Sequence, residues 1–417
     1  MSRLDELIAE LCPDGVEFFS LNILFDQFSG MGGVSGKWAE EGNCRFIDYM
    51  NAYKHLSIDV NDLPYATVKK LDQTTLMQGD ILFTSASETP DECAISSVIE
   101  DKIQDGIFLD DHLFGLRIKA QYRENISPSY LKYVFRTDAF RTQMKKTVRG
   151  VTRFYVSKTD FMKLVIPVPP LPVQHEIVRI LDSFTELTAE LIAELTSELT
   201  ARKKQYYCYR GSLLTFDDMV NELEFDKLFQ FQNGFAFKSG LFRDSGKPIL
   251  RIQNIQDKRI DTTNLVYFNT NDYSIDLDQY VVRKGDIVVA MSGATTGKIG
   301  VSYSEEEFYL NQRVGKFIPK EDVIDNRYLY HLLSSYSSII YTISSGTGAQ
   351  PNLSSEKLKK LKTRVPSLEE QHRIANILDK LDAFCNDICN GISSEIVARQ
   401  KQYEYYRDKL LTFKPLS

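Results

Sequence analysis

The 417-residue sequence has no long hydrophobic run. No stretch approaches the roughly 18 consecutive apolar residues that a membrane span needs. The amino-terminal stretch MSRLDELIAEL mixes charged residues with leucine and contains no continuous apolar segment. We therefore expect no membrane association and no secretion through a signal peptide.

Cysteine is scarce, with six residues in the whole chain and no C-x-x-C pair. Only Cys385 and Cys389 lie close together, four positions apart on a helical pattern. This spacing argues against a zinc site, so no metal site is predicted. A reducing cytoplasm suits such a cysteine pattern.

An excess of positive charge is also missing, because the formal net charge is -7. That balance argues against a protein that coats nucleic acid indiscriminately. It does not exclude specific DNA binding, since a local basic patch can bind DNA within an acidic chain. Charge alone therefore leaves the partner open.

The chain does contain an internal repeat. Residues 174–182 read QHEIVRILD and residues 371–379 read QHRIANILD, an offset of 197 positions from 174 to 371. The match continues without a gap as far as LLTF at residues 213–216 and 410–413. Length and an apolar content of 43% allow two or three domains, and a duplicated segment of about forty residues indicates two related halves.

Each copy of the repeat has the apolar spacing of a long amphipathic helix. Apolar residues recur three or four positions apart from Ile177 to Leu199 and again from Ile374 to Ile396. Each helix is predicted to run about 38 residues, or about 55 Å. A single helix of this kind usually faces the core of a globular domain, but two copies with the same seam favour pairing as a coiled coil. We predict an antiparallel pair, because only that arrangement gives both halves the same environment.

The segments that precede the two helices also resemble each other. MQGDILFTSAS (77–87) parallels RKGDIVVAMSG (283–293), and both place Gly-Asp before an apolar, β-rich run. The predicted fold class is α+β, with two pseudo-repeated mixed α/β domains separated by two long antiparallel helices that form a coiled-coil spacer. We expect an amino-terminal segment packed with the helical region at 1–20, the first domain at 21–168, the central helix at 169–216, the second domain at 217–365 and the carboxy-terminal helix at 366–417.

Four motifs give the chain a resemblance to a known family. They are LCPDGVEFFSL near the start, GFAFKSGLF at 234–242, GTGAQPNLS at 346–354, and VPSLEEQHRIANILDKLDAF with its earlier counterpart VPPLPVQHEIVRILDSF. Through these motifs the chain resembles the DNA-specificity subunits of type I restriction-modification systems over nearly its whole length. One departure is GVTRFYVS at 150–157, where the family usually shows a Gly-Gln-Asn type of loop.

The resemblance implies a non-catalytic subunit of the prokaryotic cytoplasm. Each globular segment would be a target-recognition domain that reads one half of a split, asymmetric site in double-stranded DNA, and the helices would set the spacer. The implied protein partners are two methyltransferase subunits and, in the full complex, restriction/translocase subunits. No cofactor is expected on this chain, whereas the partners would use S-adenosylmethionine, and ATP with Mg²⁺ for restriction.

A basic run lies beside the glycine loop of the first half, with seven positive charges between residues 132 and 153 against only Asp138. Such a run is usually a solvated surface, but it also suits contacts to phosphates. The predicted DNA-binding residues of the first domain are Lys37, Arg45, Asn51, Lys54, Lys145, Lys146, Arg149 and Arg153. Those of the second domain are Lys238, Arg251, Gln253, Asn254, Lys298, Gln350 and Asn352. Asn, Gln and Arg can read base edges, while Lys and Arg hold phosphates; for each residue alone, an ordinary surface position stays an open alternative.

Tyr206 and Tyr403 are the predicted partner-binding residues. They occupy equivalent positions in the tyrosine-rich ends of the two helices, near which we expect the methyltransferase subunits to dock. The repeated His175 and His372 stand at the helix starts beside a glutamine, where a structural or interface role outweighs catalysis.

The glycine turn FSGMGG at 28–33 raises the alternative that this chain itself binds S-adenosylmethionine. A cofactor turn of that type lies between a strand and a helix. Gly36 interrupts the helix that should follow, and the second half keeps only Gly234 of the glycine cluster. Neither a Pro-Cys nucleophile motif nor an Asn/Asp-Pro-Pro-aromatic motif occurs. We therefore predict a bend in the chain that holds no cofactor.

Two further segments imitate catalytic motifs. GATTGKI at 293–299 resembles a phosphate-binding loop but is one residue short and has Ile in place of the Mg²⁺ ligand, so a hairpin turn is predicted. Asp91, Glu100 and Lys102 suggest a metal-dependent nuclease, but the second half lacks both pieces. The alternatives to a DNA-recognition subunit are thus a stand-alone methyltransferase or nuclease, and a coiled-coil adaptor without DNA contact.

Overall fold

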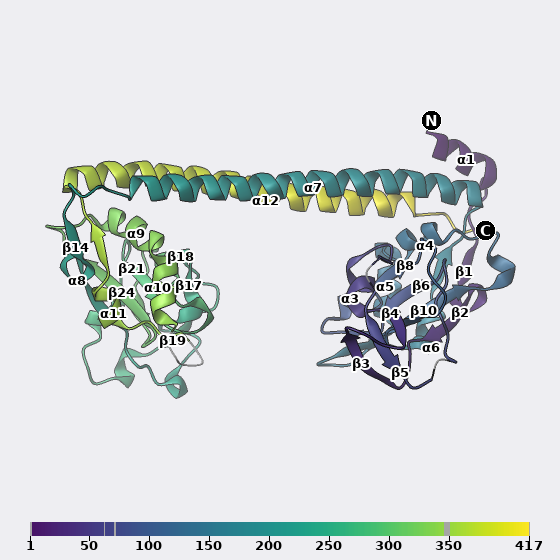
Figure 1. Ribbon diagram of the computed structural model, residues 1–417, viewed down its shortest axis with the longest axis horizontal. Helices are drawn as coiled ribbons and strands as arrows, with labels where there is room; N and C mark the ends of the chain where they lie inside the picture. The colour runs from purple at the N-terminus through teal and green to yellow at the C-terminus, as the bar shows by residue number, and fades with distance from the viewer. Residues whose placement is uncertain (1, 62, 71, 346–350, 417) are drawn as a thin grey trace. The chain divides into compact units, whose positions relative to one another are not determined.

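The computed structural model describes residues 2–61, 63–70, 72–345 and 351–416 (Figure 1). It divides into two compact units, Met1–Leu195 with Ser394–Ser417 and Thr196–Ser393. The predicted DNA-binding residue Gln350 lies outside the described residues. Within those residues, no helix is both long enough and apolar enough to cross a membrane.

The first unit contains a mixed domain of short helices and strands. Its short helices are α1 (Arg3–Leu11), α2 (Leu21–Leu24), α3 (Tyr49–Lys54), η1 (Pro90–Glu92), η2 (Ala120–Tyr122), α4 (Pro128–Val134), α5 (Asp138–Lys145) and α6 (Lys158–Phe161). Its strands are β1 (Phe18–Ser20), β2 (Phe25–Ser29), β3 (Val34–Ala39), β4 (Cys44–Ile47), β5 (Tyr65–Val68), β6 (Ile81–Thr84), β7 (Ala86–Ser87), β8 (Ser96–Val98), β9 (Ile107–Leu109), β10 (Leu113–Ile118), β11 (Val148–Arg149), β12 (Phe154–Val156) and β13 (Val165–Pro167). They form sheets in the orders β2-β10-β6-β8, β3-β5-β4-β9, β11-β12-β7 and β1-β13.

The second unit repeats this plan. Its short helices are α8 (Phe225–Leu228), η3 (Ser239–Leu241), η4 (Ile252–Asn254), η5 (Thr270–Asp272), η6 (Asp278–Tyr280), η7 (Gly293–Thr295), α9 (Asn326–Ser335), α10 (Ser337–Ser344) and α11 (Ser355–Lys359). Its strands are β14 (Glu222–Glu224), β15 (Phe229–Asn233), β16 (Lys247–Leu250), β17 (Ile255–Gln256), β18 (Lys258–Ile260), β19 (Val266–Phe268), β20 (Val281–Val282), β21 (Ile287–Ala290), β22 (Ile299–Val301), β23 (Phe308–Leu310), β24 (Val314–Pro319) and β25 (Lys362–Arg364). They form sheets in the orders β15-β24-β21-β22-β18-β17, β19-β16-β23-β20 and β14-β25.

A strand in the interior of each main sheet, β6 or β21, is buried on both faces. Side chains alternate across a strand, so Ile81 and Phe83 of β6 pack with α4 and α5, whereas Leu82 packs with the second sheet. In the same way Ile287 of β21 packs with α9, and Val288 packs with strands β16 and β23. Each domain therefore consists of a helical layer, a main sheet and a smaller sheet, which is the α+β class that the sequence predicted.

Two glycines allow the smaller and main sheets to approach closely at the same place in both domains. A Cβ atom added to Gly30, directly after β2, would lie 1.9 Å from the backbone oxygen of Asp110. A Cβ atom on Gly234, directly after β15, would lie 2.0 Å from the backbone oxygen of Asn311. Gly30 is followed by strand β3 and not by a helix, so the bend predicted for the FSGMGG turn is confirmed.

A buried glutamine attaches each domain to the start of a long helix. Gln174 accepts a hydrogen bond from the Ser127 backbone N–H at 2.9 Å and donates to the Pro169 carbonyl oxygen at 2.6 Å. Its equivalent, Gln371, accepts from the Asp325 backbone N–H at 2.9 Å and donates to the Pro366 carbonyl at 2.9 Å. Neither glutamine side chain is exposed to solvent. The QH motif of the repeat is therefore a structural joint.

The long helices are α7 (Leu171–Leu213) and α12 (Leu368–Leu410), of 43 residues each. They are longer than the predicted span of about 38 residues, because each continues through its polar, tyrosine-rich end. In the first unit, Thr185 Oγ1 of α7 lies 2.9 Å from Tyr403 Oη of α12. In the second unit, Lys258 Nζ lies 2.5 Å from Asp382 of α12 and 4.8 Å from the ring centre of Tyr206 of α7, which makes these two helix residues neighbours. Early residues of one helix meet late residues of the other, so the predicted antiparallel pairing is confirmed (Figure 1).

A second polar contact, about two helical turns beyond the glutamine, reinforces each joint. In the first unit Tyr133 Oη of α4 donates to Asp182 of α7 at 2.6 Å. At the equivalent place in the second unit, His331 Nε2 of α9 lies 2.8 Å from Asp379 of α12. His331 is 1% exposed, and its Nδ1 atom has no hydrogen-bond partner. Burial lowers the pKa of His331 below its usual value, and Asp379 only partly opposes this effect.

Replacing Gly234 with Ala should destabilise the second unit by about 1–3 kcal/mol, because the new methyl group would overlap the backbone of Asn311, which cannot rotate away. Gly240→Ala is the matched control, since nothing lies within 4 Å of its added Cβ atom. Urea unfolding of the two variants measures the difference. Equal stability of the two variants would contradict the close approach.

The depressed pKa of His331 should make the joint of the second unit sensitive to acid. The unfolded histidine binds a proton more readily than the folded one, so the stabilisation is complete above the unfolded pKa of about 6.5 and is lost as the pH falls through the folded pKa. The protection of the α9 amides against hydrogen exchange, taken relative to the intrinsic rate at each pH, should therefore fall from pH 7.5 to 5.5.

His331→Tyr, which introduces the residue found at position 133, should remove this acid response. Helix α4 of the same molecule is the internal reference, because Tyr133 does not titrate in that range. An unchanged response in the His331→Tyr protein would show that another group is responsible.

Candidate nucleic-acid interface

The inner part of the basic run supports the fold of the first unit. Lys132 is nearly buried, and its Nζ atom lies 2.9 Å from both Glu100 and Asp182. Arg136 donates to the Ser96 carbonyl at 3.1 Å, and Arg141 donates to the Ala94 carbonyl at 2.7 Å. Burial lowers the pKa of each of these two guanidinium groups to about 10, which leaves both charged at neutral pH. These three cations are occupied within the domain and are not available to phosphates.

The outer part of the run is exposed. Lys145 lies 2.5 Å from Asp91, and Arg149 lies 3.1 Å from Asp160, with both cations about half exposed. Lys146 and Arg153 are exposed as well. Surface ion pairs of this kind contribute little to stability, so a phosphate can replace the carboxylate at small cost. The four outer residues that the sequence singled out therefore remain candidates for phosphate contacts.

The other first-domain candidates differ in their availability. Lys37 lies 3.1 Å from Asp110 and also contacts Asp111; burial alone would lower its pKa, but these two carboxylates raise it above the usual value. Arg45 donates to Tyr65 Oη at 2.9 Å and lies over the ring of the same tyrosine. Lys54 is exposed on α3.

Asn51 and Asn254 turn out to be equivalent braces. The Asn51 amide donates to the Asp59 carbonyl at 2.7 Å. Asn254, which is 2% exposed, donates to the Asp261 carbonyl at 3.0 Å and accepts from the Arg251 backbone N–H at 3.0 Å. The side-chain amide of Asn254 thus serves its own loop, and its DNA contact stays a prediction.

The remaining second-domain candidates lie in turns. Lys238, Gln253 and Asn352 are exposed. The Arg251 guanidinium donates to the Asn264 carbonyl at 3.3 Å, and Lys298 donates to Gln256 at 3.1 Å, so both are partly held by the domain.

A cavity of about 650 Å³ opens beside the glycine loop of the first domain. It is lined in part by Tyr49, Met50, Tyr53, Glu88, His112 and Arg153. The rings of Tyr49 and Tyr53 stack at 5.8 Å between centroids. Strand β12, which follows the loop, pairs with β7 through Phe154 and Ser87, and this pairing places Arg153 at the cavity. The cavity combines aromatic faces with groups of both charges, which suits contact with bases more than with phosphates alone.

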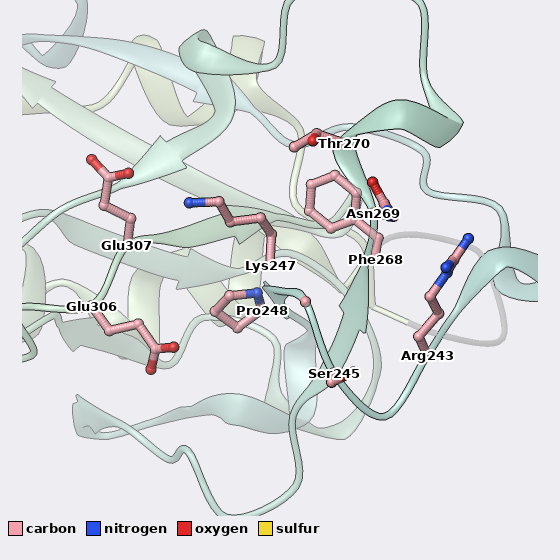
Figure 2. Close-up of a pocket in the computed structure, with 10 residues that line it drawn as sticks. Arg243, Ser245, Lys247, Pro248, Phe268, Asn269, Thr270, Glu306 and Glu307 are labelled. Carbon is pink, nitrogen blue, oxygen red and sulfur yellow. The ribbon is translucent and has the colours of Figure 1, made fainter.

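A second hollow, of about 570 Å³, lies in the second domain and does not suit DNA (Figure 2). Figure 2 shows Arg243, Lys247, Glu306 and Glu307 around it. Arg243 is paired with Asp272 at 2.8 Å. The two glutamates would repel a phosphate, so we do not include this hollow in the interface.

The segments that imitate catalytic motifs have structural explanations. Residues Gly293–Thr295 form η7 in the connection between the antiparallel strands β21 and β22, so the predicted hairpin turn is confirmed. Asp91 pairs with Lys145, while Glu100 contacts Lys132 and Ser57, so these carboxylates serve separate contacts. Among the described residues, Asp110, Asp111 and His112 form one cluster with metal-ligand geometry, but the ammonium group of Lys37 already occupies its acidic side.

Tyr206 and Tyr403 lie in the seam of the helix pair. Tyr206 is 6% exposed, and Lys258 Nζ lies 4.8 Å from the centre of its ring. The Tyr403 hydroxyl forms the hydrogen bond with Thr185 described above. Both tyrosines therefore pack between the two helices. Their role in partner binding stays a prediction, and the exposed residues near them are available for direct contact with a partner.

Those neighbours form two equivalent apolar patches that inspection of the sequence missed. In the first unit Phe184 and Leu187 of α7 are 40% and 61% exposed, and the Phe184 ring stacks on Tyr406 of α12 at 5.9 Å. The offset of 197 positions carries these residues to Leu381, Phe384 and Tyr209 of the second unit. Phe384 is 65% exposed and Tyr209 is 51% exposed. The repeat offset was the signal that could have identified them.

Comparison with known proteins supports the architecture. The family profile described as "Type I restriction modification DNA specificity domain" matches residues 45–201 and 219–398. A type I restriction enzyme specificity subunit named in Haemophilus influenzae is 36% identical over 270 residues, which cover 63% of this chain and 68% of that protein. One of Escherichia coli is 34% identical over 274 residues, which cover 63% of this chain and 66% of that protein.

A solved structure of similar fold is described as "Structural basis underlying complex assembly and conformational transition of the type I R-M system". It matches with a TM-score of 0.74 at 16% identity, over 96% of this chain and 98% of that one. At this identity the match speaks for the fold alone. The profile and the two relatives decide the family: the chain belongs to the DNA-specificity subunits of type I restriction-modification systems and is a non-catalytic DNA-recognition subunit.

Proposed function

We propose that each mixed domain reads one half of a split, asymmetric site in double-stranded DNA, and that the long helices set the gap and carry two methyltransferase subunits. The observation that carries this proposal is the duplication of the fold down to single contacts, such as those of Gln174 and Gln371. Two copies of one framework with different exposed side chains suit two different short sequences, because bases are read by side chains while the framework sets their position.

The charges support DNA contact at selected places. The exposed cations of the first domain, Lys145, Lys146, Arg149 and Arg153, lie within nine positions of one another around the β11–β12 turn. In an acidic chain such a local patch gives binding strength through phosphates, and discrimination then depends on polar groups at base edges.

The two apolar patches on the helices support the proposed partners. A patch of Phe184, Leu187 and Tyr406 and its equivalent of Leu381, Phe384 and Tyr209 offer the same arrangement twice. Equivalent surfaces bind equivalent partners, so two copies of one subunit are the expected occupants. We propose that these are the methyltransferase subunits, which would supply S-adenosylmethionine; restriction/translocase subunits using ATP and Mg²⁺ would join the full complex in the prokaryotic cytoplasm.

The DNA site can be read directly from methylation. Coexpression of this chain with its methyltransferase subunits, followed by single-molecule sequencing of the host genome, should show modified bases within a motif of two defined halves and a fixed gap. A stable complex without such a motif would contradict DNA reading and favour an adaptor role. A continuous motif without a gap would contradict the two-domain arrangement.

Substitutions in the apolar patches should remove the methyltransferase subunits one at a time. Leu187→Ser or Phe384→Ser should each weaken one docking site by about tenfold or more, because burying such a side chain stabilises a contact by about 1.5–3 kcal/mol. Native mass spectrometry should then detect one bound subunit with either single variant and none with the double variant.

Lys401→Ser provides the control for these variants, since Lys401 is an exposed polar residue of α12 outside both patches. It should keep two bound subunits. Two subunits retained by the Leu187→Ser, Phe384→Ser double variant would place the docking surface elsewhere.

A further inference from the structure

The turn between β23 and β24 of the second unit is held by backbone hydrogen bonds from several segments. The Asn311 N–H donates to the Leu250 carbonyl of β16 at 3.0 Å. The Arg313 carbonyl accepts from the Met291 N–H, directly after β21, at 2.9 Å. Within the turn, the Val314 N–H donates to the Asn311 carbonyl at 2.8 Å. The backbone of this turn is therefore clamped between the two sheets.

The first unit contains the same clamp between β9 and β10. The Asp110 N–H donates to the Ile47 carbonyl of β4 at 3.1 Å, and the His112 carbonyl accepts from the Ser85 N–H at 2.9 Å. The Leu113 N–H donates to the Asp110 carbonyl at 3.0 Å. Each of the three hydrogen bonds has its counterpart in the second unit, formed by residues at the equivalent positions of the fold.

The two glycines complete the clamp. Gly30 packs on the backbone of Asp110, and Gly234 packs on the backbone of Asn311, each too closely for any side chain. The next residue along the chain adds a fourth hydrogen bond in both units, from Met31 N–H to the Leu109 carbonyl at 2.8 Å and from Phe235 N–H to the Leu310 carbonyl at 2.8 Å. Gly30 of the FSGMGG bend therefore helps to fix the turn between β9 and β10, and Gly234 does the same for the turn between β23 and β24.

The side chains at the tip of the clamped turn differ between the units. Gln312 and Arg313 are exposed in the second unit. Asp111 and His112 occupy these positions in the first unit, with side chains 45% and 55% exposed. Turns with the same backbone hydrogen bonds therefore carry an amide and a guanidinium in one domain, and a carboxylate and an imidazole in the other.

The segments around Arg153 and Asn352, two of the predicted DNA contacts, lie beside these tips. In the first unit the Val156 N–H donates to the carbonyl of Ser85, the residue that also holds His112. In the second unit the Leu353 N–H donates to the carbonyl of Met291, the residue that also holds Arg313. The tip of each turn therefore lies on the same face of its domain as the neighbouring segment around Arg153 or Asn352. His112 and Arg153 line the same cavity of about 650 Å³.

We propose that the two clamped turns are base-reading elements, with Gln312 and Arg313 reading one half of the DNA site and His112 reading the other. This inference rests on the proposed function and names its specificity-determining residues. A side chain that reads a base must be held on a rigid backbone, and the clamped turn provides such a backbone. Arg pairs well with the O6 and N7 atoms of guanine, and Gln pairs well with the N6 and N7 atoms of adenine.

The turn of the first domain holds the ring of His112 in a defined orientation. His112 Nδ1 lies 3.0 Å from Asp110 and 2.9 Å from Asp111, so the ring donates through Nδ1. In the neutral ring Nε2 is then an acceptor, which can receive a hydrogen bond from an exocyclic amino group of a base. Lys37, which contacts the same two carboxylates, is a positioning residue for this turn.

The test uses the complex of this chain with its methyltransferase subunits. Methylation rates are measured on the cognate DNA and on a panel in which each defined base pair of either half is replaced in turn. Arg313→Ala should lower the rate on cognate DNA by about tenfold to a hundredfold and abolish discrimination at one or two positions of one half only. His112→Ala should act on the other half only.

Arg283→Ala is the matched control, because Arg283 is an exposed arginine of the same domain that pairs with Glu307 at 3.0 Å, away from the turn. It should leave the base preferences of both halves unchanged. The double exchange Gln312→Asp with Arg313→His, which transfers the first-domain side chains onto the second clamp, should alter preferences in the same half as Arg313→Ala. Thermal unfolding and assembly with the methyltransferases should match the unmodified chain for all variants.

Three results would overturn the inference. One is unchanged preference at every position in the Arg313 and His112 variants. Another is a uniform loss on all DNA with a weaker salt dependence, which would make Arg313 a phosphate contact. The third is an effect of Arg313→Ala on both halves. If the unmodified complex shows no split motif, the proposed function fails; if the motif is present and survives the substitutions, only this inference fails.

Discussion

The attachment of each domain to its long helix depends on a buried glutamine side chain. Gln174 and Gln371 each accept from a backbone N–H at the start of a domain helix and donate to a proline carbonyl at the start of the long helix, in a position without solvent. An apolar residue there would leave buried backbone groups unpaired, which costs about 1–3 kcal/mol for each group. Because the helix start is also part of the domain core, through residues such as Val173 and Ile374, the domain and the first turns of its helix form one packed body.

On that base the molecule separates a repeated framework from variable exposed side chains. The glycine contacts, the asparagine braces and the backbone clamps occur at equivalent places in both units, while the exposed residues of the turns differ. This division suits a subunit that must recognise two unlike DNA sequences with one architecture. The clamps within this framework tolerate exchange of the tip side chains, since their hydrogen bonds join backbone groups only.

The fold was largely predictable from the sequence, whereas the interface was predictable only in part. The repeat and the three-to-four spacing led to two long antiparallel helices and an α+β class, because periodic burial is a local property of the chain. The domain boundaries stay predictions. Among the DNA candidates, Asn254 is held inside its own loop. The inner cations of the basic run, such as Arg136, bind buried carbonyl groups, which a count of charges cannot reveal.

By itself the sequence determined the duplication, the helix pair and the family. Each of these follows from residue spacing or from motifs, which can be recognised without the folded structure. Only the tertiary structure decided which polar residues support the domains and which are free to meet DNA. It also brought Arg313 near Leu353 and His112 beside Arg153, since hydrogen bonds from distant strands set those neighbours. The distance between two residues along the sequence does not predict such contacts. A polar side chain is available for DNA only where the fold does not use it in hydrogen bonds of its own.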